Sequence, residues 1–516
     1  MPVPESTVLH RLSGLAAVAP GGRTAVVDEV FTGDPLGEVA VADAEDVTAA
    51  LATARAAQRE WAARPVRERI AVLDRYRKSV YRERDRLLDI IQAETGKARW
   101  TAQEEILGVL AGARYYARTA GGLLRPRRVP GPLPLVTGAR VHHRPKGVVG
   151  VIAPWNYPMF LAIGDSLPAL LAGNAVLLKP AARTPFSALA NAELLYRAGL
   201  PRGLLAVLPG PGATVGRAIA DGCDFLMFTG STATGRTLAR RCADRLIGFA
   251  AELGGKNPMI VTAGADLDAV ARIATRACFS NAGQLCLSIE RIYVQQRVHE
   301  QFTEKLVTAV AGMKLGPGYD FGWDMGSLTS AEQLETVSKH LADATSKGAR
   351  ICTGGRPRPD LGPLFFEPTV LTGVTEAMDC ARAETFGPLV SLYPVAEVDE
   401  AVEQANDSDY GLNAAVFAAT PAEGAAIAAR LRCGAVTVGE GYAAAAASPG
   451  APMGGMGDSG LGRRHGPDGL LKYTEPQTIA TAGTGIMGPP AGGSPERFHR
   501  MQVPIAEFIA RLPGRP

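Results

Sequence analysis

The sequence is poor in several features that mark specialised classes of protein. Its 516 residues carry a net charge of only +3, which gives no charge excess to hold a polyanion. Nucleic-acid binding and adsorption to a charged membrane are therefore not expected. The seven cysteines are odd in number, widely spaced and without a C-x-x-C pair, which argues against a disulfide framework or structural zinc. A reducing, cytoplasmic setting without a metal site is the expectation.

No stretch of the chain has the pattern of a membrane anchor. The most apolar segment, residues 147–178, is long enough to span a bilayer, but three prolines and Asp165 interrupt it. We therefore predict a buried strand, a loop and a helix within it. The first 14 residues lack a cationic region followed by an apolar core, so no secretory signal is expected.

What the sequence does contain is a large apolar content broken into short pieces. Hydrophobic residues make up 47 % of the chain, which fits a folded protein and excludes global disorder. The length suggests about two to four domains. The 59 glycines and 37 prolines are scattered, so they indicate many turns between short elements.

Two patterns of secondary structure follow each other along the chain. Residues 46–124 show helical periodicity, with Gly96 as a stop signal. Beyond residue 146, short apolar runs alternate with helical segments, which is typical of parallel strands buried on both faces. The fold class is therefore predicted to be α/β. The predicted strands are Gly147–Ile152, Ala175–Leu178, Ala206–Leu208, Phe225–Phe228, Pro258–Val261, Arg291–Val294 and Ala415–Phe417.

Two glycine-containing loops follow predicted strands, where parallel sheets place their ligands. Loop 210–216 resembles a dinucleotide fingerprint, but its third glycine is one place late and Pro211 lies inside it. A plain tight turn is the better interpretation. Segment 228–235 is a stronger signal, because its small residues leave backbone amides open at a helix start, which suits a pyrophosphate. Gly230 and Ser231 would make those contacts, although a generic capping turn has a similar sequence.

Three residues with chemical potential lie in different segments. Cys286 lies in a polar loop, but a lone cysteine is more often a small buried hydrophobe than a nucleophile. Glu252 stands beside two glycines just before an apolar strand, and an ordinary surface acid is equally consistent with that context. Asn156 lies between Pro154 and Pro158, which would hold it as a rigid side-chain donor. Taken singly, none of the three identifies a reaction.

Taken together and in order, the motifs resemble those of the aldehyde dehydrogenase superfamily. Within it they are most similar to the NADP-type succinate-semialdehyde dehydrogenases of actinobacteria. The resemblance runs from about residue 25 to about residue 480, and the spacing between Glu252, Cys286 and Glu384 is also typical. The ordered motifs are Pro-Trp-Asn-Tyr-Pro, Lys-Pro, Phe-Thr-Gly-Ser, Glu-Leu-Gly-Gly-Lys, Gly-Gln-x-Cys and Glu-x-Phe-Gly-Pro.

The resemblance implies a covalent mechanism. Cys286 would attack the aldehyde carbon as a thiolate, and the Asn156 side-chain amide and the Cys286 backbone amide would donate to the resulting oxyanion. An unperturbed thiol has a pKa of about 8.5, so activation is required, with Glu252 and the nicotinamide cation as candidate sources. Glu252 would then be the general base for thioester hydrolysis. Because the coenzyme-A-acylating branch lacks this glutamate, a free carboxylic acid is the predicted product.

The resemblance also implies a nicotinamide cofactor, NADP or NAD. Lys179 and Glu384 would bind its riboses, and Phe386 would lie near the nicotinamide ring. The family's NAD-specific pattern has a glutamate three residues after the lysine, but here that position is Ala182. A 2′-phosphate would meet no negative charge there and could pair with Lys179 or Arg183, so NADP is favoured. The remaining contacts would come from Trp155, Gly212, Gly230, Ser231 and Leu253.

The aldehyde itself is left open between two classes. Enzymes for succinate semialdehyde typically hold its distal carboxylate with two arginines, whereas this chain has Gly164 or a near neighbour and Ser280 there. Because a carboxylate enclosed without a cation is costly, an uncharged aliphatic or aromatic aldehyde is the alternative, unless Arg463 or Arg464 compensates. A non-catalytic binding or structural protein of this fold is a remote third hypothesis, since nucleophile, base and oxyanion donor are intact.

The architecture that the resemblance implies has two domains, a flap and an arm. Exposed strand edges in the flap need a partner, so a homodimer or homotetramer is expected. Residues 503–512 carry apolar side chains at helical spacing, which predicts a helix docked on its own subunit or a neighbour rather than on a membrane. The expected parts are a Rossmann-type nucleotide-binding domain (1–135 and 147–254), an α/β catalytic domain (255–450), a β oligomerisation flap (136–146 and 471–481) and a carboxyl-terminal arm (482–516).

Overall fold

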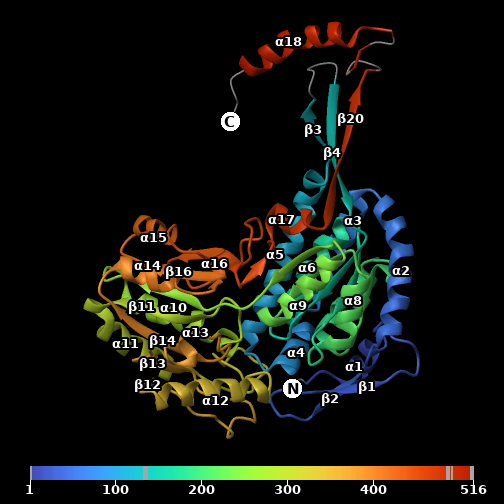
Figure 1. Ribbon diagram of the computed structural model, residues 1–516. Helices are drawn as coiled ribbons and strands as arrows, with labels where there is room; N and C mark the ends of the chain where they lie inside the picture. The colour runs from blue at the N-terminus through green and yellow to red at the C-terminus, as the bar shows by residue number, and fades with distance from the viewer. Residues whose placement is uncertain (1–2, 132–136, 484–487, 490–491, 512–516) are drawn as a thin grey trace. The chain divides into compact units, whose positions relative to one another are not determined.

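The computed structural model describes residues 3–131, 137–483, 488–489 and 492–511. The chain divides into two compact units, one of residues 1–123 with 145–473 and one of residues 124–144 with 474–516. The larger unit contains both large sheets (Figure 1). Every residue predicted above for catalysis or cofactor binding belongs to this unit.

Four strands of the first large sheet coincide with apolar runs that predict strands. Within the described residues its strand order is β19-β9-β8-β5-β6-β7, and all neighbours except β19 and β9 pair in parallel. Every residue of β5, β6 and β8 is buried, as the parallel pattern predicts. The strands are β5 (Val148–Ile152), β6 (Ala175–Lys179), β7 (Leu205–Val207), β8 (Phe225–Thr229), β9 (Gly248–Glu252) and β19 (Gly460–Leu461).

The second large sheet carries the order β12-β13-β14-β11-β10-β16-β17 over the part of the chain that the structure describes. Only β12 pairs antiparallel there. A hydrophobic core of helix and strand residues packs on it. The strands are β10 (Asn257–Val261), β11 (Ile289–Gln295), β12 (Arg350–Thr353), β13 (Thr369–Thr372), β14 (Leu389–Val395), β16 (Asn413–Phe417) and β17 (Ala435–Val438).

Four consecutive helices form the amino-terminal part, as the periodicity predicts. The first of them starts at a capping box in which Asp43 accepts from the Asp46 backbone and Asp46 accepts in return. The predicted stop at Gly96 is confirmed: its φ is +71°, and a side chain there would collide with Ser327. These helices are α2 (Ala44–Ala63), α3 (Val66–Arg82), α4 (Arg84–Thr95) and α5 (Arg99–Leu123).

Further helices follow the strands of both sheets. Helices α2 and α6 both pack on β6. The tight turn expected at residues 210–216 is wrong, because Gly212–Gly216 forms one wide π-helical turn that continues directly into the next helix. These helices are α6 (Pro158–Leu171), α7 (Pro185–Arg197), α8 (Arg217–Gly222), α9 (Thr232–Asp244), α10 (Leu267–Phe279), α11 (Gln296–Ala311), α12 (Ala331–Ser346), α14 (Val398–Asn406), α15 (Pro421–Ala428) and α17 (Gly466–Leu471).

The smaller unit contains a sheet of β3 (Arg127–Pro130), β4 (Thr137–Pro145) and β20 (Thr474–Ala482), in the order β20-β4-β3, and the helix α18 (Pro495–Arg511). The expected flap segment at 471–481 begins too early, because Leu471 ends α17. Residue 136 of the other flap segment and Leu512 of the arm lie outside the described residues. The arm's helix begins at Pro495 rather than Val503.

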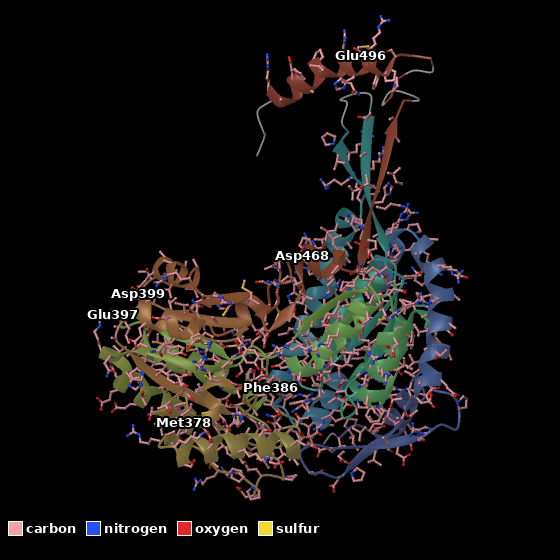
Figure 2. All side chains as sticks on the ribbon, in the orientation of Figure 1. Met378, Phe386, Glu397, Asp399, Asp468 and Glu496 are labelled. Atoms are coloured by element: carbon pink, nitrogen blue, oxygen red, sulfur yellow. The ribbon has the colours of Figure 1, made fainter. Side chains whose placement is uncertain are left out.

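The α/β fold class is confirmed, and residues 147–178 contain β5, a loop and α6 as predicted. Among the described residues, no helix combines the length and the apolar character needed to cross a bilayer. The division of the larger unit into nucleotide-binding and catalytic domains stays a prediction. Phe386 lies where the two sheet-bearing parts of this unit meet (Figure 2).

Candidate active site

Cys286 lies in a rigid loop between α10 and β11. Asn281 and Ala282 precede it with left-handed φ values of 52° and 53°, which residues with a Cβ adopt only where packing fixes them. At Gly283 a Cβ would overlap the carbonyl oxygen of Gly387, so only glycine fits. These constraints hold the loop before Cys286 in one conformation.

The backbone of Cys286 is also fixed from the second sheet. Asn257, at the start of β10, donates from Nδ2 to the carbonyl oxygens of Cys286 and Ser288, at 2.8 Å each. Its Oδ1 accepts from the backbone N–H of Asn413 at 3.0 Å. The strand ends of this sheet therefore position the loop that carries Cys286.

Asn156 reaches the same loop from the first sheet. It follows β5, is buried, and donates from Nδ2 to the carbonyl oxygen of Gln284 at 3.0 Å. Gln284 in turn accepts at Oε1 from the backbone of Thr329 at 2.9 Å. The amide predicted as an oxyanion donor thus lies within the hydrogen-bond network of the loop that carries Cys286.

A fully buried ion pair supports Asn156 from behind. Lys97 Nζ lies 2.7 Å from Glu105 Oε1 and donates to the carbonyl oxygen of Asn156 at 2.6 Å. Glu105 accepts the backbone N–H groups of Met159 and Phe160, at 2.9 and 3.0 Å, at the start of α6. Because both charges are fully desolvated, each depends on the other to remain ionised. The pair therefore fixes the turn that carries Asn156.

Glu252 is the last residue of β9, a strand that the sequence did not predict because Gly-Phe-Ala-Ala-Glu lacks a run of β-branched residues. Burial raises the pKa of its carboxyl to about 7, while the Arg464 charge acts in the opposite direction. A Cβ at Gly454 would come within 2.7 Å of Glu252 Oε1, so glycine leaves room for the carboxylate. A carboxyl with this pKa is suited to general base catalysis near neutral pH.

The Cys286 thiol is not activated by the protein alone. Burial raises its pKa to about 12, and the charge of Glu252 acts in the same direction. Arg464 opposes both effects. Of the two expected sources of activation, the charge of Glu252 therefore opposes formation of the thiolate.

Arg464 belongs to a buried cluster that the sequence did not predict. Its Nη2 lies 2.6 Å from Asp165 Oδ2 and 3.0 Å from Thr229 Oγ1. Lys472 Nζ lies 3.5 Å from Asp165 Oδ1. Burial alone would raise the pKa of Asp165, but Arg464 and Lys472 hold it below its usual value. The only sequence signal was a lone aspartate inside an apolar segment.

One cavity, of about 300 Å³, brings together the proposed catalytic residues and most of the predicted cofactor residues. Gly230 and Ser231 are at the start of α9, where Ser231 caps the helix, and their backbone amides suit an anion. The rings of Trp155 and Phe386 meet edge to face at 5.6 Å. The lining of this 300 Å³ cavity includes Trp155, Asn156, Gly230, Ser231, Glu252, Leu253, Cys286, Glu384 and Phe386.

Glu384 and its neighbours are held by a second buried ion pair. Glu384 Oε1 accepts from the Gly255 backbone at 2.7 Å, and burial raises the pKa of this carboxyl to about 8. Glu290, which pairs with Lys256, accepts the backbone N–H of Phe386 at 2.9 Å. Phe386 has a left-handed φ of 52°, so this contact fixes an otherwise unfavourable conformation.

Three of the predicted cofactor residues do not line the 300 Å³ cavity: Lys179, Ala182 and Gly212. Lys179 is buried at the end of β6, its Nζ donates to the Pro180 carbonyl oxygen at 3.0 Å, and burial lowers its pKa to about 8. The turn that begins at Gly212 lies against it, since a Cβ at Gly216 would be 3.5 Å from Lys179 Cδ. A buried ammonium that donates to a carbonyl fits a site for the hydroxyls or phosphate of a nucleotide.

A second cavity, of about 340 Å³, also borders Cys286 and Asn156. Aliphatic and aromatic side chains predominate in it, and several belong to a buried hydrophobic cluster. Ser280, at one expected arginine position, is buried and lies 2.7 Å from the Tyr442 hydroxyl. The apolar lining includes Leu107, Tyr157, Phe160, Leu161, Leu285, Leu287, Tyr442, Ala443, Ala446 and Met453.

The family model and the similar sequences found for this chain agree with each other. The model of the "Aldehyde dehydrogenase family" matches residues 18–479. A Mycobacterium ulcerans protein, provisionally named succinate-semialdehyde dehydrogenase (NADP+) 2, is 61 % identical over 100 % of both chains. A Mycolicibacterium smegmatis relative with a corresponding provisional name is 59 % identical, also over 100 % of both.

Solved structures agree in fold. A succinate-semialdehyde dehydrogenase from Burkholderia pseudomallei superposes with a TM-score of 0.87 at 36 % identity, over 90 % of this chain and 96 % of that one. An aldehyde dehydrogenase from Bacillus cereus in complex with NAD+ gives a TM-score of 0.85 at 32 % identity, over 90 % and 94 %.

Proposed function

The chain belongs to the aldehyde dehydrogenase family, and on that premise we propose that it oxidises an aldehyde to the free carboxylic acid with NADP+. The observation that carries the proposal is the convergence of Cys286, Asn156 and Glu252 on one cavity. A nucleophile, an amide donor and a carboxyl with a pKa of about 7 are the groups that thioester formation and hydrolysis require.

In the first half of the reaction, the Cys286 sulfur forms a bond to the aldehyde carbon after its proton has passed to a base. The carbonyl oxygen becomes an oxyanion, which accepts hydrogen bonds from Asn156 Nδ2 and from the Cys286 backbone N–H. The chemistry that a bound nicotinamide supplies is acceptance of the hydride from this carbon, which leaves a thioester on Cys286.

In the second half, Glu252 takes a proton from water as the water oxygen attacks the thioester carbon. The carbon–sulfur bond breaks, the thiolate returns to Cys286, and the product leaves as a carboxylic acid. The buried position of Glu252 supports this role, because burial keeps its proton affinity high enough to accept the proton of water.

NADP+ is the coenzyme that the cofactor residues favour. Ala182 is exposed and leaves the region beyond Lys179 without the carboxylate that would repel a 2′-phosphate. Arg183 is available nearby, since its contact with Glu332 is long, at 3.4 Å, and exposed. The mycobacterial relatives carry NADP(+) in their names, whereas the Bacillus cereus structure contains NAD+.

Two classes of aldehyde are candidates. Succinate semialdehyde is the substrate in the names of the relatives. The apolar lining of the 340 Å³ cavity favours an uncharged aliphatic or aromatic aldehyde instead. Arg464, which the sequence offered as a compensating cation, is already paired with Asp165, and this supports the uncharged class.

We also propose that the protein is a homodimer or homotetramer of the cytoplasm. The oligomer is supported by β20, an edge strand of its sheet whose residues beyond Thr474 are all exposed. The reducing setting is supported by the seven cysteines, each of which is a free thiol.

The test of the proposed function is the absorbance of reduced nicotinamide formed from NADP+ with butanal or succinate semialdehyde. We expect turnover by the wild type and a loss of at least about a thousandfold in Cys286→Ala, because no other group supplies the nucleophile. Cys352→Ala, at a half-buried cysteine on β12, is the control and should keep full activity. Turnover that survives in Cys286→Ala would overturn the mechanism.

A further inference from the structure

The 340 Å³ cavity contains one polar cluster within its apolar lining. Glu104 and Arg276, from α5 and α10, are both lining residues. Glu104 Oε1 accepts from Arg276 Nη2 at 2.7 Å, and the guanidinium also lies over the Tyr442 ring, 5.7 Å from its centroid. The cation of this cluster is therefore occupied by a carboxylate and an aromatic ring.

Two tyrosine hydroxyls complete the cluster around the same carboxylate. Tyr442 donates to Glu104 Oε1 at 3.0 Å, and Tyr157 donates to Glu104 Oε2 at 3.3 Å. The Tyr442 hydroxyl also lies 2.7 Å from Ser280 Oγ. Glu104 thus satisfies one arginine and two hydroxyls at once, and its charge is balanced by a single opposite charge.

The other basic side chains in the lining of this cavity are either paired with a carboxylate or neutral. Arg464 is the other arginine there, and it lies 2.6 Å from Asp165. The remaining basic side chain, His465, is neutral at pH 7, because burial lowers its pKa to about 4. A carboxylate brought into the cavity would meet arginines that already have carboxylate partners, and Glu104 and Asp165 would repel it.

We propose that Glu104 determines which aldehydes the enzyme accepts. By holding Arg276 and the hydroxyls of Tyr157 and Tyr442 in a neutral cluster, it keeps the cavity open to uncharged aliphatic or aromatic aldehydes and excludes a distal carboxylate. This inference rests on the proposed aldehyde oxidation and adds a specificity-determining residue to it.

The first test uses the wild-type enzyme with NADP+ and two aldehydes of the same carbon number, butanal and succinate semialdehyde. We expect kcat/KM for butanal to exceed that for succinate semialdehyde by about tenfold or more, because a distal carboxylate would meet the like charge of Glu104, whereas butanal meets only the apolar lining. A preference for succinate semialdehyde would overturn the proposal. If neither aldehyde is oxidised, the proposed function itself fails.

The second test is Glu104→Gln, which keeps an acceptor for the two tyrosines but releases Arg276 from its carboxylate. The ratio of kcat/KM for succinate semialdehyde to that for butanal should rise by about tenfold, mainly through a lower KM for succinate semialdehyde. In the double variant Glu104→Gln/Arg276→Gln the ratio should return to within about twofold of wild type.

Glu440→Gln is the matched control for charge. Glu440 accepts from the Tyr442 backbone at 2.9 Å but does not line the cavity, so the same change of charge there should leave the ratio unchanged. An unchanged ratio in Glu104→Gln, or an equal rise in Glu440→Gln, would overturn the role of Glu104 while leaving aldehyde oxidation intact.

Discussion

On one side of Cys286 lies a cavity of about 300 Å³ that offers backbone amides and two carboxyl groups, and on the other a cavity of about 340 Å³ lined mainly by hydrocarbon. In the first, Glu252 and Glu384 have pKa values raised by burial to about 7 and about 8. In the second, Glu104 is paired with an arginine. In the proposed function this difference separates proton transfer from substrate selection: the carboxyl groups with raised pKa values line the proposed cofactor cavity, and the paired charge lines the proposed aldehyde cavity.

The largest effect on activity is predicted for a substitution of Glu252, and it tests the proposed difference between the two cavities. In Glu252→Gln the first half-reaction should persist as a rapid burst of reduced coenzyme, while steady-state kcat falls by about a thousandfold, because water loses its base. Stopped-flow absorbance measures both phases. Since the carboxylate is the active form, wild-type kcat should fall about tenfold per pH unit below a pKa of about 7 and level off above it. Loss of the burst in the variant would contradict the separation of roles.

A smaller effect is expected at Lys97, which supports the wall that both cavities share at Asn156. Lys97→Met leaves Glu105 buried without its partner and should lower the free energy of unfolding by about 3–5 kcal/mol. Release of the Asn156 carbonyl should also lower kcat by about a hundredfold, with KM nearly unchanged.

The double variant Lys97→Met/Glu105→Leu separates these two effects. It removes both charges, so thermal unfolding should return toward the wild-type midpoint while kcat stays low. Recovery of kcat together with stability would show that the pair is only structural and does not position Asn156.

The smallest predicted effect lies on the cofactor side, at Ala182. Ala182→Glu introduces a carboxylate beyond Lys179 and should lower the ratio of kcat/KM for NADP+ to that for NAD+ by about tenfold through repulsion of the 2′-phosphate. Ala181→Glu adds the same charge at the neighbouring residue and serves as the control. A wild-type enzyme that prefers NAD+ tenfold would contradict the NADP assignment.

The parts of the fold that the sequence predicted well are those that depend on neighbouring residues. Strands such as β5 and β6 are continuous apolar runs, and Gly96 ends its helix by a local backbone conformation. Predictions were less accurate where context decides: β9 lacks a strand pattern, and Gly212–Gly216 forms a helical turn instead of a tight one.

The candidate site shows the same difference between features that neighbouring residues determine and features that distant residues determine. Cys286, Glu252 and Asn156 could be proposed because ordered motifs surround each of them, and their roles stay predictions for the variants above. Nothing local to Lys97 predicted its hydrogen bond to the Asn156 carbonyl, and nothing local to Asp165 predicted a partner 299 positions away.

By itself, then, the sequence determined the α/β class, the positions of most apolar strands along the chain and the chemical groups available for a covalent reaction. Local periodicity and contiguous motifs carry that information. The tertiary structure decided which charges are paired, because Glu104, Arg276 and Tyr442 come from segments up to 338 positions apart and meet only in the folded chain. Charges distant in the sequence are paired only by folding, and on our proposal the pairing of Glu104 with Arg276 selects the aldehyde.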